Sequence, residues 1–195
     1  NFGFMFAPNY HRAMKYVGPT RKKIGKRTIF NMIGPLSNPA LVDRQVVGVF
    51  DKKLLKIFAY ALKNLNTKFA WIVNSEDGLD EISPYAKTNV IQLKNGKFTE
   101  IIIDPDKLKI NAEKFENILG NDAKFNAQKI IEIFKGKDND FSKAVCLNAA
   151  AGLIVAEIHN NFEFAYNEAR KHILSGKAYH HLIPLQVGFL LKNND

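Results

Sequence analysis

The stretch at residues 45–73, QVVGVFDKKLLKIFAYALKNLNTKFAWIV, decides the expected fold class. Its two short apolar runs, at 45–50 and 68–73, predict buried strands. Between them, Asp51 can cap a helix that continues to about residue 64 with apolar side chains at core spacing. Because a strand, a helix and a strand in this order favour parallel pairing, the stretch predicts an α/β fold.

The sequence on either side of this stretch adds a hairpin and further helices. Asn95-Gly96 separates two apolar runs and suits a type I′ turn, so a β-hairpin is expected over residues 88–103. Two short helices are expected within 9–25, with a break at Gly18 and Pro19. Later helices are expected at 112–119, 121–134, 141–159 and 162–192, the last with a break near Ser175 and Gly176. The expected architecture is a mostly parallel central sheet with a β-hairpin and surrounding helices.

Composition indicates a globular protein with a reduced thiol. Hydrophobic residues make up 46% of the 195 residues, and no stretch reaches the roughly 18 consecutive apolar residues of a spanning helix. The apolar start has no basic flank or cleavage site, so we expect a cytoplasmic protein without a membrane partner. The single cysteine, Cys146, lies in an apolar string and is expected to be buried and unreactive.

Positive charge is concentrated near the start of the chain. The formal net charge is +9, and residues 1–42 contain no acidic residue. The cations of this segment are Arg12, Lys15, Arg21, Lys22, Lys23, Lys26 and Arg27. Such a field attracts a carboxylate, a phosphate or a nucleic acid. The alternative for any one of these residues is an ordinary solvated helix face.

Two small groups of residues are candidates for chemistry. Asp80 and Glu81 follow the strand at 68–73, and ligands of parallel sheets bind beyond the carboxyl ends of strands. Adjacent carboxylates there can hold a hard cation such as Mg²⁺, although spacing alone favours an ordinary acidic surface loop. His11 and Arg21 stand on either side of the expected break and can face one cleft, where arginine suits a carboxylate. Taken singly, each is more typical of a solvated surface residue.

A set of motifs resembles one enzyme family along nearly the whole chain. FAPNYH at residues 6–11, RTIFNMIGPLSNPA at 27–40 and DGLDEIS at 77–83 resemble the anthranilate phosphoribosyltransferases, and the resemblance continues more weakly from NAAA at 148–151. It implies the carboxyl-terminal portion of such an enzyme, with a nucleoside phosphorylase/phosphoribosyltransferase-like fold of the class IV type. The implied reaction transfers the phosphoribosyl group of phosphoribosyl pyrophosphate to anthranilate in tryptophan biosynthesis. The complete protein is then expected to be a homodimer.

The resemblance also implies domains and site residues. Residues 1–35 would pack with an amino-terminal helical domain, and 36–195 would belong to the α/β domain. The anthranilate-binding positions would be His11, Arg21, Gly34 and Pro8, and the Mg²⁺-binding positions Asp80 and Glu81. No catalytic residue is assigned, because orienting a neutral amine beside the ribose can matter more than a strong base.

Departures from the family pattern limit what this chain is expected to do alone. Arg12 stands where the family usually has proline. The Gly-Thr-Gly-Gly-Asp loop that cradles phosphoribosyl pyrophosphate is absent, and the sequence contains no Gly-Gly pair. By resemblance that loop belongs upstream of Asn1, so the isolated chain is expected to be inactive.

Two other functions remain open from the residues. The basic segment could serve a nucleic-acid-binding relative of the same fold, and a nucleoside phosphorylase would share the general architecture. Nucleic acid is not the expected partner, because the segment has no recognisable reading motif. The pair Asp80 and Glu81 would also have no use in binding a phosphate backbone.

Overall fold

The computed structural model describes residues 2–3, 5, 7–11, 14–26, 28–29 and 32–192, with the side chains of 7, 8, 14, 15, 21, 22 and 187–192 outside the description. The chain forms two compact units, Asn1–Asp43 and Arg44–Asp195. Each unit is considered by itself below. Among the described residues, no helix is long and apolar enough to cross a bilayer.

The first unit is built from short helices. It contains α1 at Ala7–Tyr10, α2 at Met14–Ile24 and the 3-10 turn η2 at Gly34–Leu36. The predicted break at Gly18 and Pro19 is wrong, because α2 continues through both residues. Pro19 is the sixth of the eleven residues of α2, so its ring, which fixes φ near the helical value, removes one backbone hydrogen bond from the helix interior without ending the helix. Gly25 follows α2 with φ +62°, the left-handed conformation typical of a helix end.

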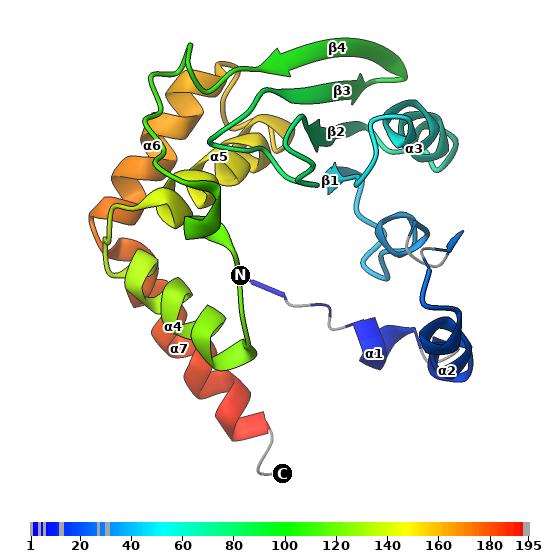
Figure 1. The fold of residues 1–195 in the computed structure, drawn as a ribbon, viewed down its shortest axis with the longest axis horizontal. Helices are drawn as coiled ribbons and strands as arrows, with labels where there is room; N and C mark the ends of the chain where they lie inside the picture. The colour runs from blue at the N-terminus through cyan, green and yellow to red at the C-terminus, as the bar shows by residue number, and fades with distance from the viewer. Residues whose placement is uncertain are drawn as a thin grey trace. The chain divides into compact units, whose positions relative to one another are not determined.

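The second unit contains a four-stranded sheet in the order β1-β2-β3-β4 (Figure 1). The strands are β1 at Arg44–Gly48, β2 at Phe69–Ser75, β3 at Thr88–Lys94 and β4 at Lys97–Ile103. Helix α3 at Leu54–Asn64 connects β1 to β2, and these two strands pair in parallel. The predicted α/β class and its strand, helix and strand unit are confirmed.

The described part of the sheet is mixed rather than mostly parallel. Only β1 and β2 are parallel, whereas β2 with β3 and β3 with β4 are antiparallel. The connection from β2 to β3, at residues 76–87, contains no helix that could carry the chain back across the sheet. The chain therefore reverses direction after β2.

The turn between β3 and β4 is the predicted type I′ hairpin. Asn95 has φ +48° and Gly96 has φ +76°, so both central residues are left-handed. This turn matches the twist of the two flanking strands, and asparagine and glycine adopt its conformation at little cost. The hairpin is confirmed at the predicted residues.

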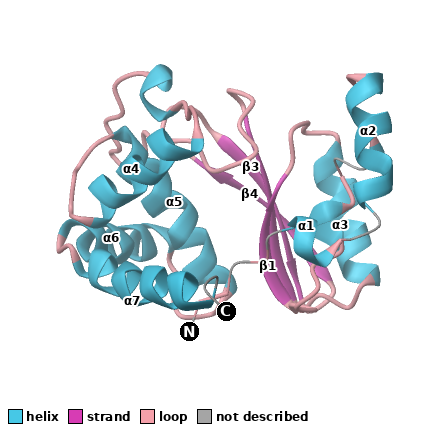
Figure 2. Cartoon of the chain, turned by 90° about the horizontal axis from the view of Figure 1, so that it is seen from below, coloured by secondary structure: helices cyan, strands magenta, loops and turns pink. Residues whose placement is uncertain are grey.

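Helices cover both faces of the sheet (Figure 2). Helix α3 lies on one face, and the group on the other consists of α4 at Ala123–Phe134, α5 at Asp140–Val155, α6 at Phe162–Leu174 and α7 at Lys177–Lys192. The predicted break near Ser175 and Gly176 is confirmed. The prediction of a helix at 112–119 is wrong, because this segment forms only the 3-10 turn η3 at Phe115–Ile118.

The core of the second unit lies between β2 and α5. All seven residues of β2 are buried, as predicted for a central strand. Helix α5 is buried on most of its surface and contributes small side chains, among them Ala150 and Ala151 at 0% exposure. Small side chains let a helix approach a sheet closely, so α5 is the central packing helix of this unit.

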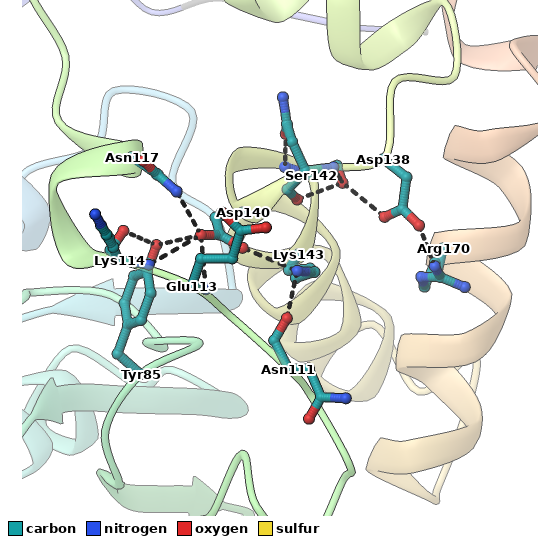
Figure 3. Close-up of polar contacts among 11 residues, drawn as sticks. Tyr85, Asn111, Glu113, Lys114, Asn117, Asp138, Asp140, Ser142, Lys143 and Arg170 are labelled. Carbon is teal, nitrogen blue, oxygen red and sulfur yellow. Dashed lines mark hydrogen bonds and ion pairs between the residues drawn. The ribbon is translucent and has the colours of Figure 1, made fainter.

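The first residue of α5, Asp140, anchors the chain segment before η3 (Figure 3). Its carboxylate accepts hydrogen bonds from the backbone N–H groups of Glu113 and Lys114, at 2.9 and 3.3 Å, and from the Asn117 amide at 3.0 Å. Lys143 donates from the next turn of α5 at 2.8 Å. These contacts hold residues 113 and 114 outside a helical backbone, which explains why the predicted helix starts late.

Cys146 provides a test of the packing of α5. The thiol is fully buried, and burial raises its pKa to about 11. Because the thiolate is the reactive form, the native protein is expected to show no reaction with a thiol reagent such as Ellman's reagent at pH 8. One thiol per chain should react after unfolding in guanidinium chloride. Rapid labelling of the native chain would contradict the buried position.

Candidate functional site

The acidic pair lies at the carboxyl-terminal edge of the parallel strands. Strands β1 and β2 end at Gly48 and Ser75, and the loop at 76–87 carries Asp80 and Glu81 beside this edge. Both side chains are exposed. The sequence argument thus predicted the placement of the pair correctly, because the carboxyl ends of parallel strands meet at one edge of a sheet.

Backbone hydrogen bonds and one other acidic residue shape the first half of the loop. Ser75 N–H donates to the carbonyl of Leu79 at 2.9 Å, and Gly78 turns the chain with φ +93°. The Asp77 carboxylate accepts from the Leu79 N–H at 3.2 Å and from the Ser83 hydroxyl at 2.5 Å. Asp77 is therefore occupied in holding the loop, whereas its neighbours at 80 and 81 are not.

The carboxylates of Asp80 and Glu81 suit a cation. Among the described residues, neither makes a side-chain hydrogen bond or an ion pair. Although Glu81 is exposed on one side, its partial burial raises the pKa of its carboxyl, and the charge of Asp80 raises it further. A cation between the two groups would relieve this repulsion.

The donor set also indicates which kind of cation fits. No group of three or more His, Cys, Asp or Glu side chains that could hold a metal occurs in the described part of the chain. Two carboxylates are too few for a structural site made by protein alone. They match Mg²⁺, which keeps several waters and shares its remaining positions with substrate phosphates.

A cavity of about 760 Å³ adjoins the acidic pair. Its wall is largely apolar and comes from β1, β2, α4 and α5, with Asp80 and Glu81 among the lining residues. Lys129 and Asn148 add polar groups. Cavities of this size and character accommodate small ligands.

Sequence reasoning overlooked two residues that shape this site. A Cβ on Gly48 would lie 1.6 Å from the carbonyl oxygen of Asp80, so β1 and the acidic loop touch at this glycine. A lone glycine in a strand pattern often marks such a close backbone approach, and this feature could have identified Gly48. The other is Asn148, a polar residue in a largely apolar helix, whose side-chain amide bonds to the backbone of Ile82.

The positions expected to contact anthranilate belong to the first unit. His11 follows α1 and is half-buried, and Gly34 begins η2 and is exposed, with open space where a Cβ would stand. Pro8 lies in α1 and Arg21 in α2, and their side chains are outside the described part, as is Arg12. Their joint role in binding is a proposal considered below.

Comparison with known proteins shows the family of the chain. The family model described as "Glycosyl transferase family, a/b domain" matches residues 1–179. An anthranilate phosphoribosyltransferase from Pelagibacter ubique is 78% identical over 186 residues, which cover 95% of this chain and 56% of that protein. One from Alkaliphilus metalliredigens is 42% identical over 178 residues, covering 91% of this chain and 52% of that protein. The chain spans about half the length of the curated relatives it matches.

Solved structures give the same match in three dimensions. The anthranilate phosphoribosyltransferase from Thermus thermophilus has a TM-score of 0.82 at 34% identity, covering 91% of this chain and 53% of that one. The Saccharomyces cerevisiae enzyme in complex with 4-fluoroanthranilate has a TM-score of 0.83 at 28% identity, covering 92% and 52%. The same yeast enzyme with PRPP and Mg has a TM-score of 0.77 at 26% identity, covering 87% and 49%. The chain therefore belongs to the glycosyl transferase family defined by this a/b domain, and it matches the carboxyl-terminal part of anthranilate phosphoribosyltransferases.

Proposed function

We propose that the complete protein containing this chain transfers the phosphoribosyl group from phosphoribosyl pyrophosphate to anthranilate, in tryptophan biosynthesis. The observation that carries the proposal is the pair of exposed carboxylates, Asp80 and Glu81, beside a ligand-sized cavity at the carboxyl ends of parallel strands. Neither carboxylate has a hydrogen-bond or ion-pair partner among the described residues. The 78% identity to an anthranilate phosphoribosyltransferase supports this substrate assignment over a nucleoside phosphorylase.

The acidic pair would serve the leaving group. Asp80 and Glu81 would hold Mg²⁺, the ion that is present with PRPP in the structure of the yeast relative. When bound, the ion neutralises negative charge that develops on pyrophosphate as the bond to the ribose breaks. The carboxylates themselves fix where that positive charge sits, beside a cavity whose wall is largely apolar.

The first unit would bind the acceptor. Arg21 would pair with the carboxylate of anthranilate, with His11, Gly34 and Pro8 on the same binding surface. A guanidinium matches a carboxylate in two parallel hydrogen bonds, and the yeast relative is known in complex with 4-fluoroanthranilate. The acid-free charge of residues 1–42 would draw both anionic substrates toward this segment. We also propose that the complete protein is a cytoplasmic homodimer.

A reconstituted reaction tests the proposal. The complete protein, supplied with phosphoribosyl pyrophosphate, Mg²⁺ and anthranilate, is expected to form phosphoribosylanthranilate, measured by the loss of anthranilate fluorescence. The isolated 195-residue chain is expected to be inactive, since it contains no glycine-rich phosphate loop. No transfer by the complete protein, together with steeply salt-dependent DNA binding, would instead favour a nucleic-acid-binding relative.

Substitution of Arg21 tests the acceptor site. In the complete protein, Arg21→Ala is expected to raise KM for anthranilate by about 10- to 100-fold, because a charge-assisted hydrogen-bond pair is worth about 1.5–3 kcal/mol. The KM for phosphoribosyl pyrophosphate should change little. Lys23→Ala is a matched control, since Lys23 is an exposed cation on the same helix. An equal rise in KM for anthranilate in both variants would contradict a direct contact of Arg21 with anthranilate and would indicate only general attraction by positive charge.

A further inference from the structure

The side chain of Asn148 forms two hydrogen bonds with the backbone of Ile82, the residue that follows the acidic pair. Its Oδ1 accepts a hydrogen bond from Ile82 N–H at 2.9 Å, and its Nδ2 donates to the Ile82 carbonyl at 3.1 Å. The same Nδ2 donates to the Ala144 carbonyl at 2.9 Å, one turn earlier in α5. The amide is thus fixed to its own helix and bonded at two points to the loop.

The acidic pair is held on its other sides as well. Before the pair, Leu79 accepts from Ser75 N–H at the end of β2. Beneath it, Gly48 at the end of β1 leaves room for the Asp80 carbonyl. After it, the Ile82 side chain is fully buried in the core. The bond to Asn148 completes this support and links the pair to the central packing helix.

We propose that Asn148 is a positioning residue that sets the placement of the Asp80 and Glu81 carboxylates for Mg²⁺ and its phosphate ligand; this inference rests on the function proposed above. Two exposed carboxylates can hold a shared cation only if their backbone is fixed, because the protein supplies few ligands. Asparagine suits the task since one side chain must both accept from N–H and donate to C=O. Groups that orient metal ligands typically change metal affinity or activity by about 10- to 100-fold when removed.

Two substitutions in the complete protein separate this role from simple packing. Asn148→Ala removes both bonds to Ile82. Asn148→Asp keeps the shape and the acceptor but replaces the donor with a charged oxygen that faces the Ile82 carbonyl. The matched control is Asn161→Ala, which removes an amide hydrogen bond to the backbone N–H of Phe164 at the start of α6. The thermal unfolding midpoints of the three variants measure how much stability each loses with its side-chain hydrogen bonds.

The main measurement is binding of Mn²⁺, an oxygen-seeking substitute for Mg²⁺, in the presence of inorganic pyrophosphate, followed by the electron paramagnetic resonance of free Mn²⁺. Both Asn148 variants are expected to bind about tenfold or more weakly than the unchanged protein, and the Asn161 variant equally well. The Mg²⁺ concentration for half-maximal turnover should rise by a similar factor, while KM for anthranilate stays the same.

The outcomes distinguish this inference from the proposed function. Unchanged Mn²⁺ binding in both Asn148 variants, equal weakening in Asn161→Ala, or no Mn²⁺ binding by the unchanged protein would each overturn the positioning role. Weaker binding in the Asn148 variants alone would support it. Because Mn²⁺ binding is read without turnover, a failure to convert anthranilate would remove the proposed reaction and leave the binding result intact.

Discussion

Replacing Asp140 by alanine is expected to lower the free energy of unfolding by about 3–5 kcal/mol. The Asp140 residue is 3% exposed, and its carboxylate satisfies two backbone N–H groups, the Asn117 amide and the Lys143 ammonium (Figure 3). Alanine removes the buried acceptor that these four donors share and leaves the half-buried Lys143 ammonium without its ion-pair partner. Urea unfolding followed by the fluorescence of Trp71, the single tryptophan of the chain, measures the change.

Asp138 provides the matched control for this substitution. It lies two residues earlier and pairs with Arg170, but both side chains are about 40% exposed. Surface ion pairs contribute at most about 1 kcal/mol, so Asp138→Ala should cost no more than that. Similar losses for the two substitutions would show that the buried network is not what makes Asp140 important.

Asp140 should also make the fold sensitive to acid. Burial alone would raise its pKa, but the hydrogen bonds from Lys143, Asn117 and the backbone of 113 and 114 outweigh burial and lower the pKa below the ordinary value of 3.8. A carboxyl with a lowered folded-state pKa contributes stability above its unfolded pKa and loses it as the pH falls toward the folded one. The wild-type advantage over Asp140→Asn should therefore shrink below about pH 4, as urea midpoints at several pH values would show.

Gly48→Ala is expected to reduce Mg²⁺-dependent turnover of the complete protein by about 100-fold, the largest effect on activity expected from one methyl group here. The added Cβ would lie 1.6 Å from the Asp80 carbonyl oxygen and 2.6 Å from its carbon, so backbone must move. Moving the Asp80 backbone displaces the proposed metal-binding carboxylates. Initial rates at saturating anthranilate, measured over a range of Mg²⁺ concentrations, provide the test.

Gly152→Ala separates this effect from the general effect of replacing glycine. Gly152 lies in α5, and apart from its chain neighbours and the adjacent helix backbone, no heavy atom of the described residues stands within 4 Å of a Cβ added there. Alanine there should leave turnover unchanged and stabilise the helix by about 0.5–1 kcal/mol. Full activity of the Gly48 variant would mean that the acidic loop can shift without harm to the reaction.

The sequence predicted features that depend on neighbouring residues. Asn95-Gly96 specifies its turn through its own backbone preferences. The apolar spacing of α3 predicts one buried face, and the continuous apolar run of β2 predicts a strand that is buried on both faces. The break predicted at Pro19 was wrong although it also rested on a local rule. Helix α2 continues through the proline, which has no backbone N–H to donate. Rules based on neighbouring residues therefore predicted the turn and the buried segments correctly, but not the course of the helix at Pro19.

The sequence by itself determined the strand, helix and strand unit, the hairpin, and the loop that carries Asp80 and Glu81. Only the tertiary structure decided that Asn148 holds Ile82, 66 positions away, and that Gly48 lies against Asp80. The spacing of apolar residues predicts which face of a helix or strand is buried, because side chains return to the same face with a fixed period along the backbone. The partner of a polar group is set by packing between distant segments, which no local pattern encodes.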